Sequence, residues 1–223
     1  MASVSFTRDE AILALDTLLF SGEEYLNENS ASIKELSELL NSLPIVPQTM
    51  RGKIFRNCTG VNRQINMFRL SSAKGKKDTH VGTIFYAVSE DYHGNEEEIH
   101  CIANAIKRNL DYFKNAVFGA MEESYDFPEG ALLGHLHRMI EIRDSKKLKA
   151  VDVCDVCHLD LSQVYKSVPG GFMQLHLMVP VTELDSSKKY KPNEFITVCP
   201  NCHAMLHRHR PWVTRESVGE ILY

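Results

Sequence analysis

Two cysteine motifs constrain this 223-residue chain more than any other feature. Cys154 and Cys157 form one Cys-x-x-Cys motif, and Cys199 and Cys202 form the other. Such motifs bend the backbone so that both sulfurs face one ion, and two of them supply the four thiolates of a tetrahedral Zn²⁺ site. A four-thiolate site leaves no position for water, so we expect this zinc to hold the fold without catalysing a reaction. Two disulfides, or four unrelated buried cysteines, are the alternative.

Three histidines near these cysteines form a second candidate site. His203 and His207 follow Cys202 at helical positions i and i+4, so both imidazoles project from one helix face. His176 lies in the apolar run 172–181, which the pattern predicts as a strand. A lone histidine on a strand is more often half-buried than a ligand. The partnership with His203 and His207 favours the ligand interpretation, with the three side chains holding a divalent ion.

The motifs in order are Glu129-Gly130, Cys154-x-x-Cys157, Gly170-Gly171-Phe172, His176…Pro180 and Cys199-x-x-Cys202-His203-x-x-x-His207. Together they resemble the HNH nuclease domain, and more narrowly its zinc-stapled form in McrA-like restriction enzymes that cut modified DNA. The resemblance covers roughly residues 125–223. It implies a ββα-metal unit in which His176, His203 and His207 hold one catalytic ion (Mg²⁺, Mn²⁺, Ni²⁺ or Co²⁺) against the scissile phosphate. His176 and His203 are then the expected catalytic residues.

One position departs from the family pattern. The family usually has His-His-x-x-Pro, in which the first histidine binds metal and the second is the general base. Pro180 fixes the register here, so the second position is Leu177. A leucine accepts no proton, and losing a general base costs on the order of a hundredfold to ten-thousandfold in rate. Either the metal's own hydroxide does the work, or another histidine enters, or the protein is catalytically impaired and acts as a DNA-binding module. A separate alternative is an adaptor in which the histidines bind a second structural zinc.

The charge of the N-terminal part is strongly uneven, although the whole chain carries a net charge of −4. Residues 1–50 hold eight acidic side chains against two basic ones, and residues 51–80 hold eight basic side chains against one acidic one. Such asymmetry is expected of a locally basic DNA-contacting face on an acidic protein. A solvated basic surface without a partner is the alternative.

Hydrophobic periodicity predicts three helices in this part, over residues 7–20, from about 30 to 43, and over 59–68. Thr7 and Glu10 form a capping box for the first. Two helices, a break and a third helix bearing Arg and Asn suggest a helix-turn-helix-like reader of DNA. The candidate DNA-binding residues are Arg51, Lys53, Arg56, Arg63, Asn66 and Arg69. Many small helical domains share this pattern without binding DNA.

The middle of the chain is predicted less sharply. Residues 81–88 read as a strand or extended segment, 96–118 as the longest helix, and 131–149 as a further helix. His135 and His137 are two residues apart and share no helix face, so we expect both on the surface. Arg138 and Arg143 are expected to hold phosphates or to pair with Glu141 and Asp144.

These patterns predict an α+β chain with two domains. Residues 1–122 form a mainly helical DNA-recognition domain, and residues 123–223 form a zinc-stapled ββα-metal nuclease domain. No apolar run approaches 18 residues and no apolar leader begins the chain, so we expect no membrane span and a cytoplasmic location. Double-stranded DNA is the expected partner. A homodimer is expected because one active site per chain must cut two strands.

Overall fold

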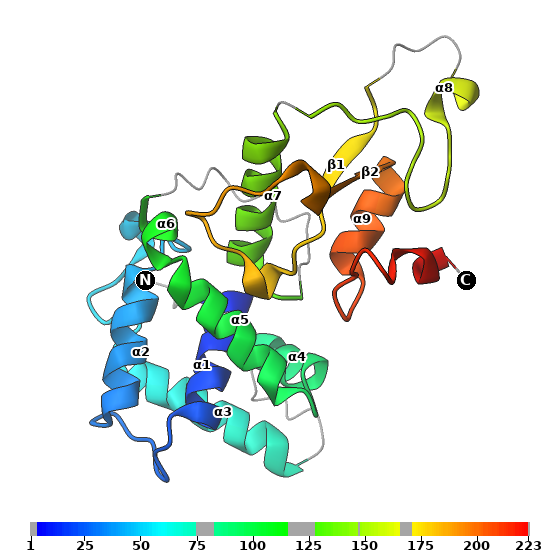
Figure 1. The fold of residues 1–223 in the computed structure, drawn as a ribbon. Coiled ribbons are helices and arrows are strands. Elements are labelled where there is room, and N and C mark those ends of the chain that lie inside the picture. The colour runs from blue at the N-terminus through cyan, green and yellow to red at the C-terminus, as the bar shows by residue number, and fades with distance from the viewer. Residues whose placement is uncertain (1–3, 75–82, 116–127, 147, 166–170, 223) are drawn as a thin grey trace. The chain divides into compact units, whose positions relative to one another are not determined.

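The computed structural model describes residues 4–74, 83–115, 128–146, 148–165 and 171–222. The chain divides into two compact units (Figure 1). Unit 1 comprises Met1–Ser124 with Glu129–Leu132, and unit 2 comprises Tyr125–Pro128 with Leu133–Tyr223. The described part is mixed, mostly helical with a small two-stranded sheet. The domain boundary expected between residues 122 and 123 lies outside the described residues.

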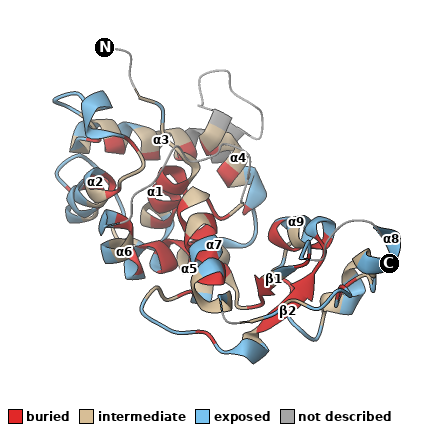
Figure 2. Ribbon diagram, turned by 90° about the horizontal axis from the view of Figure 1, so that it is seen from above, coloured by how far each residue is buried: buried red, intermediate tan, exposed pale blue. Residues whose placement is uncertain are grey.

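Unit 1 is built from helices packed around one buried helix. Its elements are α1 (Arg8–Phe20), α2 (Ala31–Ser42), α3 (Cys58–Lys74), α4 (Thr83–Asp91), α5 (Glu96–Arg108) and α6 (Leu110–Asn115). α1 contacts α2, α3, α4 and α5 (Figure 1). The run 11–15 of α1 is apolar on every side and fully enclosed, which is the pattern of a helix at the centre of a core (Figure 2).

The start of α1 is fixed by the capping box that the sequence predicts. The Thr7 backbone N–H donates to Glu10 Oε2 at 2.8 Å, and the Glu10 N–H donates to Thr7 Oγ1 at 3.4 Å. Two amide groups that a helix start leaves without a partner are thereby satisfied. The predicted capping box is confirmed.

Two predicted elements of unit 1 differ in the structure. Residues 81–88 were expected to be a strand or extended, but their described part, from Thr83 on, belongs to the helix α4, in which Phe85 and Val88 are buried. Phe85 packs edge-on against Phe68 of α3, with ring centroids 4.8 Å apart. The single helix expected over 96–118 ends at Arg108, and α6 begins after Asn109, whose Nδ2 donates to the Ala105 carbonyl at 2.9 Å.

Unit 2 contains a small sheet with helices beside it. Its elements are α7 (Ala131–Ser145, whose first two residues are counted with unit 1), α8 (Leu161–Val164), β1 (Gln174–Leu177), β2 (Phe195–Val198) and α9 (Pro200–Arg208). β1 and β2 pair antiparallel, with His176 opposite Ile196. Short 3-10 helices lie at Val181–Glu183, Pro192–Glu194 and Val218–Leu222. No described helix is both long and apolar enough to cross a membrane.

Gly130 and Asp9 fix the first turn of α7. Both carboxylate oxygens of Asp9 accept backbone N–H groups of this turn, Oδ2 from Ala131 and Oδ1 from Leu132, at 3.0 Å each. Gly130 has a φ of 94°, and a Cβ at this position would collide with the Asp9 carboxylate. Glycine is therefore required here both by the backbone conformation and by the space. This arrangement sets where α7 begins.

Candidate functional site

The four cysteines of the two motifs come together in unit 2. Their sulfur atoms all lie within 4.8 Å of one another, and Sγ of Cys157 lies 3.8 Å from Sγ of Cys199. Two thiolates on one tetrahedral zinc, with Zn–S bonds of about 2.3 Å, lie about 3.8 Å apart. The cluster can therefore hold one structural zinc, which bears out this part of the prediction.

Local structure explains why the sulfurs converge. Cys199 caps α9, and its Sγ accepts the backbone N–H of Cys202 at 3.5 Å. The first motif closes through the His158 N–H, which donates to the Cys154 carbonyl at 3.0 Å. Burial favours the neutral thiol of Cys154, but the surrounding backbone N–H groups outweigh it and lower the pKa of this thiol to about 7. The other apolar residues of this core pack around the cysteines.

The strand pair and α9 bring together the three histidines expected to bind the second ion. His176 is enclosed at 1% exposure on β1, and β2 leads through Cys199 directly into α9. α9 carries His203 and His207 on one face, and their Nε2 atoms lie 3.1 Å apart. The ring centroid of His176 lies 5.1 Å from that of His203 and 4.9 Å from that of His207. A strand pair followed by a helix thus gathers the three side chains.

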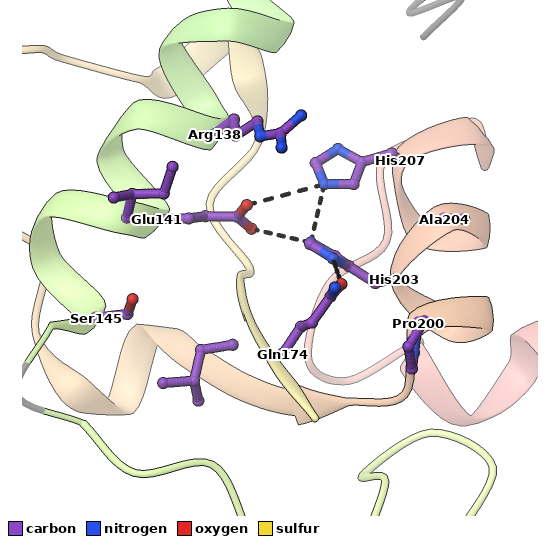
Figure 3. Close-up of a pocket in the computed structure, with 10 residues that line it drawn as sticks. Arg138, Glu141, Ser145, Gln174, Pro200, His203, Ala204 and His207 are labelled. Carbon is purple, nitrogen blue, oxygen red and sulfur yellow. Dashed lines mark hydrogen bonds and ion pairs between the residues drawn. The ribbon is translucent and has the colours of Figure 1, made fainter. Parts of the chain in front are cut away.

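A buried carboxylate from α7, that of Glu141, lies among these histidines, and Figure 3 shows its contacts with His203 and His207. Oε1 of Glu141 lies 3.1 Å from Nδ1 of His176, 3.4 Å from Nδ1 of His137 and 3.5 Å from Nε2 of His203. Oε2 of Glu141 lies 4.0 Å from Nε2 of His207. His137, Glu141, His176 and His207 offer donor atoms within 4.8 Å of one another and can hold a metal ion.

Backbone groups of Leu177 hold α7 against β1 at this cluster. The Leu177 N–H donates to Glu141 Oε1 at 2.9 Å, and the Leu177 carbonyl lies 2.9 Å from Nε2 of His137. The Leu177 side chain is completely buried. Trp212 packs on the same cluster, with its ring centroid 5.2 Å from that of His137. Gln174 contacts Nδ1 of His203 through its side-chain oxygen and so fixes the orientation of that ring (Figure 3).

Burial sets the protonation of the cluster. It disfavours the charged imidazoles and lowers the pKa of His176 to about 4 and that of His207 to about 2. Burial also acts to raise the pKa of Glu141, but the neighbouring histidines, His137 first, outweigh it and hold this pKa well below its usual range. At neutral pH the cluster therefore presents neutral imidazoles with available lone pairs and one carboxylate, which are the forms that bind metal ions.

Two members of this cluster, His137 and Glu141, were not expected from the sequence. His137 was expected on the surface and is fully buried, and for Glu141 an arginine partner was one of two expected alternatives. Arg143 pairs with Asp144, as that alternative expected, with Nη2 and Oδ2 2.8 Å apart. The signal that could have found the pair is its spacing, because residues 137 and 141 at i and i+4 share one helix face.

A pocket of about 430 Å³ opens beside the cluster, within unit 2. Glu141, His203 and His207 form part of its wall, and the exposed Arg138 lies at it (Figure 3). The other lining residues are Ile142, Ser145, Gln174, Leu175, Pro200 and Ala204. The wall thus combines metal-binding groups, one cationic side chain and apolar contact surface.

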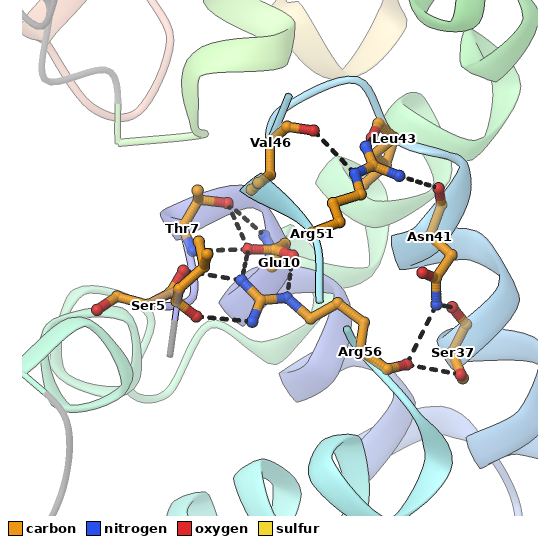
Figure 4. Close-up of polar contacts among 10 residues, drawn as sticks. Ser5, Thr7, Glu10, Ser37, Asn41, Leu43, Val46, Arg51 and Arg56 are labelled. Atoms are coloured by element: carbon orange, nitrogen blue, oxygen red, sulfur yellow. Dashed lines mark hydrogen bonds and ion pairs between the residues drawn. The ribbon is translucent and has the colours of Figure 1, made fainter. Parts of the chain in front are cut away.

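Two of the six predicted DNA-binding residues have structural roles in unit 1 (Figure 4). The Arg56 guanidinium is buried, and it bonds both carboxylate oxygens of Glu10 and the carbonyls of Val4 and Ser5. Arg51 donates to the carbonyls of Asn41, Leu43 and Val46 near the end of α2. The Arg56 guanidinium is therefore engaged within unit 1, which disfavours a direct contact with DNA.

The other four predicted DNA-binding residues are more accessible. Lys53 and Arg63 are exposed, and Asn66 and Arg69 are partly exposed. Arg63, Asn66 and Arg69 recur every three residues along α3, and Nη1 of Arg69 lies 3.4 Å from Oδ1 of Asn66. These residues keep a common helical face, and their contact with DNA stays a prediction.

Comparisons of the chain with protein-family models, with curated proteins and with solved structures give no match. Membership of the HNH or McrA-like family therefore stays a prediction.

Proposed function

We propose that this chain is a metal-dependent DNA endonuclease of the HNH type that hydrolyses phosphodiester bonds, with modified DNA, such as DNA carrying methylated cytosine, as its substrate. One observation carries the proposal. His176 from β1 and His203 and His207 from α9 converge on one point at the wall of an open pocket, next to a four-cysteine cluster suited to zinc. This is the arrangement that the resemblance to a zinc-stapled ββα-metal domain implies.

The residues of the pocket have distinct roles in this proposal. A divalent ion held by the histidines would supply Lewis-acid stabilisation of charge on the scissile phosphate. Arg138 at the pocket wall would orient the phosphate through charge-assisted hydrogen bonds. Leu175, Pro200 and Ala204 offer apolar contact surface for the adjoining sugar. Gln174 keeps His203 in one orientation at the same wall.

Substrate binding would draw on unit 1. The accessible basic and amide side chains of α3, with Lys53, would supply salt-dependent affinity and contacts to base edges. Two chains would be needed for cutting both strands, so the active form would be a homodimer. Mg²⁺, Mn²⁺, Ni²⁺ and Co²⁺ are the ions to compare, and the cytoplasm is the proposed location.

A DNA-binding module with little cleavage is a second candidate, favoured by Leu177. Its buried aliphatic side chain takes the place at which the family usually carries a proton acceptor. The backbone of Leu177 still organises the site through Glu141 and His137. Binding would then survive while the rate falls on the order of a hundredfold or more.

An adaptor that binds a second structural ion is a third candidate. It is favoured by the burial of four cluster members, since the side chains of His137, Glu141, His176 and His207 are at most 8% exposed. The pocket beside His203 argues for access to the site instead.

Cleavage of supercoiled plasmid tests the proposal. Unmodified and cytosine-methylated plasmid would be incubated with the protein and each of the four ions, and His207→Ala would serve as the control. The proposal expects metal-dependent nicking or linearisation, stronger on methylated DNA and lost in the control. Retained DNA binding without cleavage under any ion would support the DNA-binding module. Neither cleavage nor binding, with two chelator-resistant zinc ions per chain, would support the adaptor.

A further inference from the structure

The metal centre of unit 2 has more donor groups than the three expected histidines. α7 adds an imidazole and a carboxylate from residues 137 and 141, one helical turn apart. We propose that α7 supplies two ligands, His137 Nδ1 and a Glu141 carboxylate oxygen, to a transition-metal site that His176 and His207 complete. The proposal concerns the same site as the proposed nuclease, but it rests on the geometry of the cluster alone.

The tautomer of His137 supports its role as a ligand. Nε2 of His137 lies 2.9 Å from the Leu177 carbonyl, which can only accept, so Nε2 carries the proton. Nδ1 is then the nitrogen with a free lone pair. It is fully buried, faces Glu141 and has no hydrogen-bond partner among the described residues. Metal-bound histidines commonly donate their second ring N–H to a backbone carbonyl in this way.

The spacing of the donor atoms matches a coordination sphere. Two nitrogen or oxygen ligands on one tetrahedral ion, at bond lengths of about 2.0–2.1 Å, lie about 3.3 Å apart. Glu141 Oε1 lies 3.1 Å from His176 Nδ1 and 3.4 Å from His137 Nδ1. Oε2 of the same carboxylate lies 4.0 Å from His207 Nε2. The first two separations match this ligand spacing and the third is longer, while the donor atoms of all four residues lie within 4.8 Å of one another.

His203 differs from these four residues. Its side chain is 19% exposed, whereas that of His176 is 1% exposed, and it lines the pocket. Its Nε2 lies 3.1 Å from His207 Nε2, and its Nδ1 is engaged by Gln174. We place His203 on the pocket side of these four ligands, where its Nε2, 3.5 Å from Glu141 Oε1, reaches both the ion and a bound substrate.

The donor set also selects the kind of ion. Three imidazoles and one carboxylate suit Zn²⁺, Co²⁺, Ni²⁺ and Mn²⁺, whereas Mg²⁺ prefers oxygen ligands and retained water. The site is therefore expected to bind Co²⁺ or Zn²⁺ at least a hundredfold more tightly than Mg²⁺.

Metal content of the full chain and its variants tests the proposal. Wild-type protein with zinc in the cysteine cluster is titrated with Co²⁺, and bound metal is measured by elemental analysis and visible absorption. Wild type is expected to bind one Co²⁺ besides the zinc. Glu141→Gln, which keeps an acceptor for the Leu177 N–H, and His137→Gln should each weaken Co²⁺ binding more than tenfold. Met139→Ala, at an exposed position of the same helix, should leave it unchanged.

Wild-type Co²⁺ affinity in both Glu141→Gln and His137→Gln would overturn the proposal, and loss of Co²⁺ in His203→Ala alongside that result would assign the ion to the three expected histidines instead. A variant counts only if it retains the zinc of the cysteine cluster. If neither variant does, ¹⁵N NMR of the wild type decides, because zinc must shift the Nδ1 resonance of His137. None of these readouts depends on DNA cleavage, so they stand whether or not the chain is a nuclease.

Discussion

Arg56→Ala should destabilise unit 1 strongly, although Arg56 was expected from the sequence to contact DNA. The guanidinium and the Glu10 carboxylate form a two-pronged pair, with Nε–Oε1 2.6 Å and Nη2–Oε2 2.9 Å. The two side chains are 6% and 2% exposed. The guanidinium also packs on the ring of Phe6, 3.8 Å from its centroid. The substitution removes all of these contacts and leaves a buried carboxylate behind.

The magnitude follows from the charge left on Glu10, which keeps its Thr7 donors but loses its counter-charge. Removing one partner of a buried ion pair costs about 3–5 kcal/mol, mainly because the other charge stays buried without its partner. The Val4 and Ser5 carbonyls lose their donors too, at 2.9 and 2.8 Å. Arg56 has a φ of 46°, but Ala also carries a Cβ, so backbone strain changes little between the two. We expect a loss of about 3–5 kcal/mol in the free energy of unfolding.

Urea denaturation followed by circular dichroism measures this loss. Arg63→Ala is the matched control, because Arg63 lies exposed on α3. The control should change stability by less than about 0.5 kcal/mol. If α3 contacts DNA, Arg63→Ala should also weaken DNA binding and reduce the slope of the logarithm of the binding constant against the logarithm of the salt concentration by about one. A loss below 1 kcal/mol for Arg56→Ala would refute the structural role assigned to Arg56.

Three further predictions concern the site and the helices that carry it. Cys199→Ser should lose the structural zinc and the cooperative unfolding of unit 2, while unit 1 keeps its helical circular-dichroism signal. Metal analysis and calorimetry measure these two losses. An unchanged zinc content would count against the four-cysteine site. Burial raises the pKa of Asp9 from 3.8 to about 6, despite its hydrogen bonds to α7, so the folded state holds this proton more tightly than the unfolded state. The contribution of Asp9 to the free energy of unfolding is therefore fully present below about pH 4 and falls by about 3 kcal/mol as the pH rises through 6. Asp9→Asn should remove this decrease from the pH dependence of the free energy of unfolding. Leu177→His should raise metal-dependent plasmid cleavage at least tenfold if the site lacks only its base; an unchanged rate with intact DNA binding favours the DNA-binding module.

The cysteine and histidine clusters of unit 2 were largely predictable from the sequence. Both clusters depend on spacing over a few residues. Two residues between the cysteines of each motif form a turn suited to zinc, and a spacing of four places His203 and His207 on one helix face. β1 is likewise marked by its apolar run. The antiparallel pairing that sets His176 opposite Ile196 brings it to α9.

Long-range packing was not predictable in the same way. α4 reads as an extended segment because Phe85 and Val88 are typical strand residues, and only their burial against α3 makes the segment helical. The role of Glu141 depends on a hydrogen bond from Leu177, which is remote in sequence. Arg56 looks like a free cation in a basic stretch until Glu10 is found against it.

The most direct test of the account follows the cleavage rate of methylated plasmid as metal is added. Protein with one zinc in its cysteine cluster is titrated with Mn²⁺ or Co²⁺ against a fixed amount of DNA. The account predicts little cleavage before the second ion binds, a rate that saturates as that one additional ion fills its site, and none at any metal level in His176→Ala. Cleavage that is independent of the second ion, or that persists in His176→Ala, would contradict it.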